Sequence, residues 1–182
     1  HGPPQMIFHH NVGIEAGKTL RTTYPKDRLI GISWRSASRM GGNKKSFSLN
    51  NCRNIIQCNG AKFINLQYGS SEIEVQNAQK LFGVEILSAE GIDTLRDIDP
   101  MVGLVSELDL VITVSNVNAH YAGLAQTPVW VIVPKLPLWH WFRGRDDNPW
   151  YPTAKLYRQE PSETWAPVLS AVSDDLAKWL SE

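Results

Sequence analysis

The feature that most constrains this chain is an apolar run at residues 110–114, LVITV, together with the polar turn that follows it. A short, continuous run rich in β-branched residues is typical of a strand buried on both faces of a parallel sheet. The turn Ser115-Asn116-Val117-Asn118 leads into residues 119–125, whose composition favours a helix. This strand therefore delivers two Asn and His120 to the carboxyl edge of a sheet, beside a helix N-terminus. Open α/β sheets bind ligands at that edge, and helix N-termini favour anions.

Strand-like and helix-like stretches alternate along most of the chain. The expected strands cover residues 28–34, 63–66, 84–87, 110–114, 129–133 and 155–158. The expected helices cover residues 46–59, 71–82, 99–108, 119–125 and 164–180. This alternation predicts an α/β fold, a three-layer αβα Rossmann-like parallel sheet with strand order 3-2-1-4-5 and the sixth strand at the edge. In that order, the loop after the first strand faces the turn after the fourth.

Two helix starts carry explicit signals. Ser46 or Ser48 is placed to cap the helix that carries Leu49 and Cys52. Ser71 to Glu74 matches the S-x-x-E capping box, and Asp99-Pro100 suits the start of the helix before residue 108.

The domain organisation follows from length and periodicity. The chain of 182 residues is long enough for one domain with a full core. Residues 1–27 show no periodicity and are expected to form an irregular arm or an interdomain linker. Residues 28–182 then form the Rossmann-like domain, including the C-terminal helix 164–180. We expect part of the apolar face of that helix to be exposed, which would favour weak self-association.

The composition argues against several classes of partner. Lys plus Arg and Asp plus Glu are equal at 18 each, so the net charge gives no argument for nucleic-acid or membrane binding. No apolar run approaches the ~18 residues of a membrane span, and the N-terminus lacks a signal-peptide pattern. Cys52 and Cys58 show no metal-ligand spacing, which indicates free thiols in a reducing compartment and favours the cytoplasm.

A basic loop follows the first strand. It contains Arg35, Arg39, Lys44 and Lys45, with Gly41-Gly42 for close backbone approach. Such a loop suits a phosphate or diphosphate, and the alternative is a solvated basic loop. The spacing of P-loop proteins and the G-x-G-x-x-G pattern of dinucleotide-binding proteins are both absent from the sequence.

Two further features of the sequence each allow more than one interpretation. His120 is either a packed histidine or a donor to a phosphate oxygen. The stretch 134–152 is long for a loop and carries Trp139, Trp141 and Trp150. It is either a self-packed aromatic flap, or packing for another lobe, or a surface on which a sugar or base stacks, with Arg143 and Arg145 beside it.

Several motifs in order resemble one family. They are IGISWR, KKSFSL, INLQYG, DLVITVSNVNAHYAGLAQTPVWVIVP and WHWFRGRDDNPWYPTAKLYRQ. They resemble the C-terminal lobe of GT-B glycosyltransferases, in particular the heptosyltransferase-like family and its bacterial members that follow tetratricopeptide repeats. The resemblance covers residues 29–159.

The resemblance implies that this lobe binds a nucleoside-diphosphate sugar without a metal or other cofactor. A Lys after the first strand contacts the donor diphosphate, which points to Lys45 or, second, Lys44. The family's D-S-G-x-x-H or D-N-T-x-A-H turn falls on residues 115–120, so His120 and Asn116 are kept. Ser115 stands where the family has Asp, and Val117 where it has Gly or Thr. We expect a differently shaped turn and weaker donor binding than in relatives that keep the Asp.

The resemblance also implies a second, acceptor-binding lobe before this one. Related enzymes take their catalytic base from that lobe, so no catalytic residue is assigned in this chain. The leading hypothesis is the donor-binding domain of an inverting, metal-independent glycosyltransferase, inactive as an isolated lobe. The alternative is a degenerate, non-catalytic ligand-binding or interaction domain, which Ser115 favours.

The candidate site residues fall into two groups. The diphosphate-binding candidates are Lys45, Lys44, His120, Asn116, Asn118 and Ser115. The candidates for nucleotide or sugar contacts are Trp34, Arg35, Gln67, Tyr68, Trp139 and Arg143.

Overall fold

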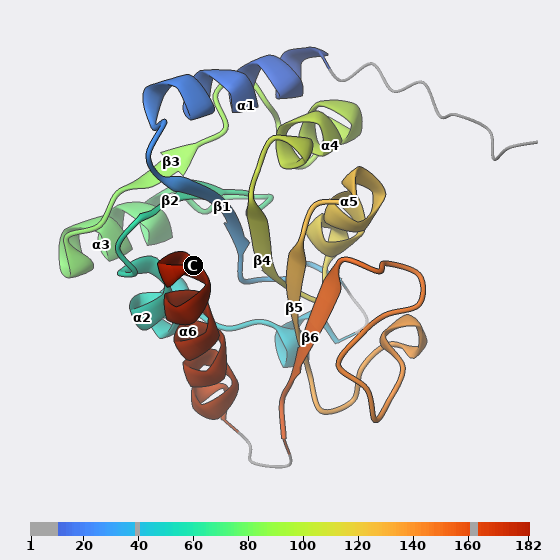
Figure 1. Ribbon diagram of the computed structural model, residues 1–182. Coiled ribbons are helices and arrows are strands. Elements are labelled where there is room, and N and C mark those ends of the chain that lie inside the picture. Colours follow the sequence, from blue (N-terminus) through green and yellow to red (C-terminus); the bar gives the residue numbers. More distant parts are fainter. Residues whose placement is uncertain (1–10, 39–40, 161–163) are drawn as a thin grey trace, which may run out of the picture.

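A six-stranded parallel sheet forms the centre of the molecule, with its strands in the order β3-β2-β1-β4-β5-β6 (Figure 1). The computed structural model describes residues 11–38, 41–160 and 164–182. The strands are β1 Arg28–Ser33, β2 Ala61–Asn65, β3 Ile86–Ser88, β4 Leu110–Val114, β5 Val129–Val133 and β6 Ala154–Arg158. The α/β class and the strand order predicted from the sequence are confirmed.

Helices cover both faces of the sheet. They are α1 Asn11–Thr23, α2 Arg53–Ile56, α3 Glu72–Phe82, α4 Ile98–Ser106, α5 Val117–Ala125 and α6 Ala166–Ser181. Three short 3-10 helices lie in the loops: η1 Gly42–Lys45, η2 Leu49–Cys52 and η3 Trp139–Trp141. Helices α1, α4 and α5 lie on one face, and α2, α3 and α6 lie on the other.

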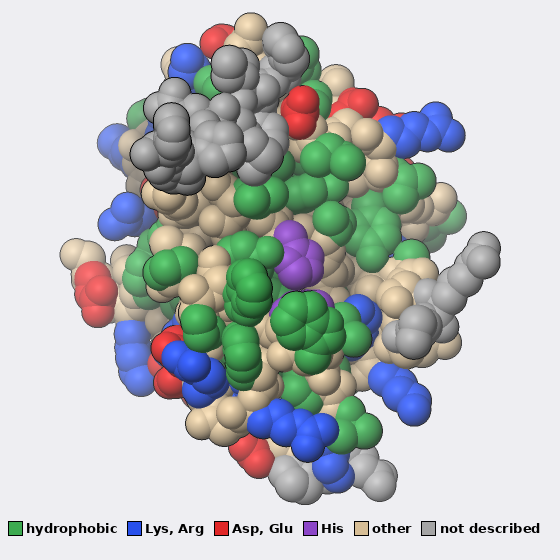
Figure 2. Space-filling view, turned by 90° about the vertical axis from the view of Figure 1, so that its right-hand side faces the viewer, with side chains coloured by type: hydrophobic (Ala, Val, Ile, Leu, Met, Phe, Trp, Pro, Cys, Tyr) green, Lys and Arg blue, Asp and Glu red, His purple; other side chains and the backbone are tan. Residues whose placement is uncertain are grey.

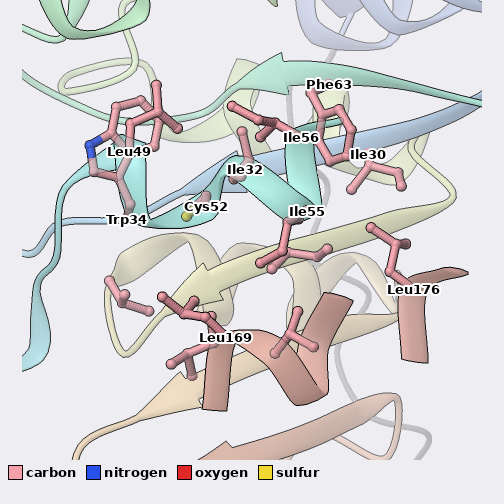
Figure 3. Close-up of a cluster of buried hydrophobic side chains, with 14 of the residues drawn as sticks. Ile30, Ile32, Trp34, Leu49, Cys52, Ile55, Ile56, Phe63, Leu169 and Leu176 are labelled. Carbon is pink, nitrogen blue, oxygen red and sulfur yellow. The ribbon is translucent and has the colours of Figure 1, made fainter. Parts of the chain in front are cut away.

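Each face has its own hydrophobic core. In Figure 3, Ile30 and Phe63 of the sheet point toward Ile55 of α2, and Leu169 and Leu176 of α6 lie beneath them. The second core joins alternate side chains of the same strands to α4 and α5. This alternation is the period of two that places successive strand residues on opposite faces.

The predicted irregular arm is wrong for the residues that the structure describes. Residues 11–23 form α1, and residues 1–10 lie outside the described ranges. Two glycines let α1 lie directly on α4, since a Cβ atom at Gly13 would lie 1.8 Å from the carbonyl oxygen of Pro100. Arg21 then pairs with Asp109 across 2.9 Å. Tertiary packing stabilises a helix that its glycines disfavour.

Local signals near the helix ends had mixed outcomes. Ser48 caps η2 through the backbone N–H of Asn50, as predicted. The capping box at Ser71 is wrong, because its side chain does not cap α3 and Glu74 instead accepts the backbone N–H of Leu49 at 2.7 Å. Helix α4 begins at Ile98, so the predicted start at Asp99-Pro100 falls within its first turn.

The C-terminal helix packs the centre of its apolar face into the core. Val168, Leu169, Val172 and Leu176 are buried, whereas Trp165 and Trp179 are only partly buried against the same core. Part of the apolar face is thus accessible at both ends of the helix, and weak self-association stays a prediction.

Candidate functional site

The carboxyl ends of β1 and β4 meet in a buried polar network. The hydroxyl oxygens of Ser33 and Thr113 lie 2.6 Å apart. The side-chain amides of Asn116 and Asn118 both donate to the Ser33 hydroxyl, at 3.1 and 3.0 Å. The turn that begins α5 is thus bonded to the neighbouring strand.

Each of these two asparagines makes further internal contacts. The Oδ1 of Asn116 accepts the backbone N–H of Asn118 at 2.9 Å and so caps α5. Asn116 also donates to the carbonyl oxygen of Arg35 at 3.0 Å, and Asn118 donates to that of Leu66 at 2.8 Å. Within the described ranges, the Oδ1 of Asn118 is buried with no hydrogen-bond partner. Both asparagines therefore orient the turn and the loop after β1.

The candidate residues that follow β2 form hydrogen bonds with the backbone of the loop after β1. Gln67 is buried, and its Oε1 accepts the backbone N–H groups of Trp34 at 3.0 Å and Arg35 at 2.8 Å. The hydroxyl of Tyr68 accepts the backbone N–H of Ala37 at 2.9 Å. Trp34 is fully buried among core residues (Figure 3), and its contact with a nucleotide or sugar stays a prediction.

Arg35 is engaged at its guanidinium group. It donates to the carbonyl oxygen of Ser70 at 2.9 Å and lies 3.4 Å from the carboxylate of Glu74. The contacts of Arg35 hold the loop after β1 against α3. Arg39 lies outside the described residues.

Lys45 is the last residue of η1, and its solvent exposure is much lower than that of its neighbour Lys44. Its side chain is buried, with 6% of the residue exposed, whereas Lys44 is exposed. Burial lowers the pKa of the Lys45 ammonium. Within residues 11–38, 41–160 and 164–182, no hydrogen bond or ion pair engages that ammonium group. A partly desolvated cation without an anionic partner favours the binding of an anion.

His120 lies in the first turns of α5 and is held on several sides. Its Nδ1 lies 2.8 Å from the hydroxyl oxygen of Tyr151. Its ring stacks on Trp141, with centroids 5.6 Å apart and planes 22° apart, and lies 5.2 Å from the ring of His140. Burial, followed by the electrostatic effects of His140 and Lys45, lowers the pKa of His120. Burial and Lys45 lower the pKa of His140 in the same direction.

The Asn116 side chain donates to the carbonyl oxygen of Arg35, so the loop after β1 and the turn after β4 face each other, as the strand order predicted. The two described histidines lie at the centre of the face in Figure 2, with apolar side chains around them. Together with Lys45, these histidines form the group that we name the Lys–His site: Lys45, His120 and His140.

The Trp-rich stretch, residues 134–152, forms a flap that hydrogen bonds hold against the domain. The indole N–H of Trp141 donates to the hydroxyl of Ser115 at 2.7 Å, and both residues are buried. Arg158 donates from its guanidinium group to three backbone carbonyls of the flap. The flap interpretation is therefore confirmed for Trp141. Ser115 is its anchor, and the side chain of Ser115 has no exposed face toward a ligand.

The outer side of the flap is open. Trp139 and Trp150 are 75% and 62% exposed, and their rings meet edge to face with centroids 6.3 Å apart. Arg143 is exposed beside them. The stacking role predicted for Trp139 thus remains available to a ligand or a second lobe.

Two residues of this site were missed from the sequence. His140 and Tyr151 stand in the flap, where no periodicity indicates a direction for any side chain. Their aromatic surroundings were visible in the sequence, but the contact with His120 depends on the path of the loop. The density of aromatic residues near residue 141 was the only available signal.

A cavity of about 310 Å³ lies beside the carboxyl ends of β2 and β3. Asn65, Gln67, Ser88 and Thr94 are among the residues that line it. No group of three or more His, Cys, Asp or Glu among the described residues is placed to hold a metal ion. In the same part of the chain, no helix is long and apolar enough to cross a bilayer.

No family model matches the chain. One curated relative, Protein FlbA of Caulobacter vibrioides, is 32% identical over 149 residues. The match covers 81% of this chain and 24% of that protein, so the chain spans about a quarter of its relative.

Two solved structures share the fold at low sequence identity. The glycosyl transferase family 9 protein from Veillonella parvula matches 96% of this chain and 52% of its own, with a TM-score of 0.68 and 14% identity. The chain shares the fold of the matched part of that protein. The E. coli ADP-heptose lps heptosyltransferase II matches 100% of this chain and 55% of its own chain, with a TM-score of 0.60 and 12% identity. The lobe thus spans about half the length of each, and at these identities the likeness shows the fold alone.

Proposed function

We propose that this lobe binds the diphosphate of a nucleoside-diphosphate sugar between η1 and the N-terminus of α5. One observation carries the proposal: Lys45 is only 6% exposed at the carboxyl edge of the sheet, and its ammonium group has no acidic partner among the described residues. A diphosphate would supply the missing negative charge. The topology supports the position, because open α/β sheets bind ligands where the strand order reverses.

The chemistry of the Lys–His site suits a leaving diphosphate. Lys45 would neutralise charge on the phosphate oxygens, and His120 would donate a hydrogen bond from its ring. The positive end of the α5 dipole, capped by Asn116, adds to this field. Lys44 is exposed next to Lys45 and would contribute a weaker, screened attraction. We propose that these groups, rather than a metal, stabilise the charge that develops on the leaving group.

The rest of the donor has places on the same edge. We propose that the nucleoside lies toward the cavity lined by Gln67 and Thr94. Tyr68, Trp139 and Arg143 would border the nucleotide or the sugar. No catalytic base is assigned in this chain.

The whole protein is a further part of the proposal. We propose that the longer chain is an inverting, metal-independent glycosyltransferase whose acceptor lobe lies outside these 182 residues, with tetratricopeptide repeats as a further module. The free thiols of Cys52 and Cys58 suit a reducing compartment, so we propose the cytoplasm.

Calorimetry tests donor binding. UDP, GDP, ADP and CDP are titrated into the chain, with and without EDTA. We expect one of them to bind, with the same affinity in EDTA. No binding of any of the four at millimolar concentration would overturn the donor-lobe proposal, and an EDTA-sensitive signal would overturn its metal-free part.

Lys45→Ala tests the assigned contact. A hydrogen bond to a charged group contributes roughly 1.5–3 kcal/mol, so we expect affinity for the diphosphate to fall about 10- to 150-fold. Lys44→Ala is the matched control, since it removes the same charge from an exposed neighbour and should change affinity little. If the two variants weaken binding equally, the burial of Lys45 has no special role in the site.

A degenerate binding lobe is the second candidate. The observation that favours it is the internal use of Ser115, Asn116 and Gln67, whose polar groups bond to the protein itself. The two candidates differ in turnover. Transfer or slow hydrolysis of a bound nucleotide sugar by the full-length protein supports the enzyme, whereas tight binding without turnover supports the degenerate lobe.

A further inference from the structure

Tyr151 contacts His120 from a loop far along the chain. Its hydroxyl oxygen lies 2.8 Å from Nδ1 of His120. The two rings meet edge to face, with centroids 5.6 Å apart and planes 66° apart. The phenol thus engages one ring nitrogen and leaves the other, Nε2, outside this contact.

Gly123 makes this contact possible. It lies three residues after His120, hence on the same side of α5. A Cβ atom at Gly123 would lie 2.1 Å from the Cδ1 atom of Tyr151, so any larger residue would displace the phenol ring. The ring therefore lies against the helix backbone, and its hydroxyl reaches Nδ1 from there.

Tyr151 is itself held in place. Its backbone N–H donates to the carbonyl oxygen of Asn148 at 3.2 Å, and its carbonyl oxygen accepts the N–H of Ala154 at 2.9 Å. Trp141 stacks on the ring of His120 and is anchored to Ser115. The backbone of Tyr151 is thus fixed, and the stacked Trp141 ring sets the plane of the His120 ring.

The hydrogen-bond inventory favours the Tyr151 hydroxyl as the donor. A phenol proton needs an acceptor, and in the described part of the chain the Nδ1 of His120 is the only acceptor that the Tyr151 hydroxyl meets. A neutral imidazole that accepts at Nδ1 carries its proton on Nε2. Burial raises the pKa of Tyr151 and lowers the pKa of His120, and both directions favour the neutral pair.

We propose that Tyr151 is a positioning residue that fixes His120 in the tautomer protonated at Nε2, so that a neutral imidazole donates to a phosphate oxygen of the ligand. The ligand part of this inference rests on the proposed function. The tautomer part concerns the ligand-free chain and stands without it.

Nitrogen-15 NMR of the histidine side chains in the ligand-free chain tests the tautomer. The parent should show one protonated nitrogen at His120, assigned as Nε2 from its couplings to the ring protons. Tyr151→Phe keeps the ring and removes the hydroxyl, so the shifts of the two nitrogens should move toward the average of exchanging tautomers. Tyr24→Phe, at the end of α1, is the control and should leave them unchanged.

Gly123→Ala gives a second route to the same state, because its methyl group displaces the Tyr151 ring without removing the hydroxyl. It should shift the His120 nitrogens in the same direction as Tyr151→Phe. If both variants remain folded by circular dichroism and the His120 nitrogens keep their parent shifts, the inference is overturned. A parent protonated at Nδ1 would overturn it as well.

Affinity for UDP, GDP, ADP or CDP separates this inference from the proposed function. With a binding diphosphate, Tyr151→Phe should weaken affinity roughly 3- to 10-fold, the value of one neutral hydrogen bond. A shifted tautomer with unchanged affinity overturns the ligand part. Absence of binding by the parent overturns the proposed function and leaves the NMR result on the tautomer intact.

Discussion

Removal of the Ser115 hydroxyl should destabilise the lobe, because the indole N–H of Trp141 loses its hydrogen-bond acceptor. Ser115 is 2% exposed, and its Oγ accepts the Trp141 Nε1–H at 2.7 Å. Ser115→Ala leaves that N–H buried without its acceptor, which costs roughly 1–3 kcal/mol. In a domain of this size, 1 kcal/mol lowers the melting temperature by about 2–4 °C, so we expect a decrease of about 2–12 °C.

The measurement is thermal and urea denaturation of the parent, of Ser115→Ala, Ser170→Ala and Trp141→Phe, and of the Ser115→Ala/Trp141→Phe double variant. Ser170→Ala, on the exposed side of α6, is the matched control and should not lower stability. Trp141→Phe removes the donor, so Ser115→Ala should cost less in that background than in the parent. The difference is the coupling energy of the pair. A change within about 0.5 kcal/mol for Ser115→Ala, with no coupling to Trp141, would refute the anchor.

Ser115→Asp separates the structural explanation of this serine from the one drawn from the sequence. If the serine marks a weakened donor site, the Asp should raise diphosphate affinity. The anchor predicts lower stability at neutral pH, because the variant buries a carboxylate. Burial raises the folded-state pKa of such a group, so the loss should shrink as the pH falls and the carboxyl becomes neutral. A variant that is more stable at pH 7 and binds more tightly would contradict the structural explanation.

Two further predictions concern the pH response and α1. The lowered pKa values of His120 and His140 mean that the unfolded chain binds more protons below about pH 6.5, so the free energy of unfolding should rise with pH through that window. Replacement of both residues by Asn should flatten the dependence of stability on pH. An unchanged dependence would exclude the two histidines as its source. Gly13→Ala should lower the free energy of unfolding by roughly 1–3 kcal/mol, because its Cβ atom meets the Pro100 carbonyl. Lys18→Ala, exposed on the same helix, should have little effect, and a Gly13→Ala variant as stable as the parent would contradict the packing of α1.

The sequence by itself determined the sheet and its order. The runs 110–114 and 129–133 are strands to the residue, because central parallel strands require unbroken apolar composition and the chain supplies it. Strand alternation with helices then leaves few topologies, which is why the facing of Lys45 and His120 could be predicted.

Tertiary structure determined the elements whose local sequence pattern was weak or fitted more than one structure. Helix α1 contains Gly13 and Gly17, which lower helix propensity, and it forms because those glycines fit against α4. Ser71 and Glu74 have the spacing of a capping box, but Glu74 is engaged by the backbone of Leu49. The same short pattern has two solutions, and packing selects between them.

The site divides in the same way. The strands are recognisable from their apolar pattern, and the carboxyl ends of parallel strands lie at one edge of the sheet. Lys45, His120 and the two asparagines could therefore be placed on that edge from the sequence. His140 and Tyr151 approach His120 from a flap whose path is fixed by side-chain hydrogen bonds of Ser115, Arg158 and Asn148. Contacts of that kind join residues that no period relates, so only the folded chain reveals them.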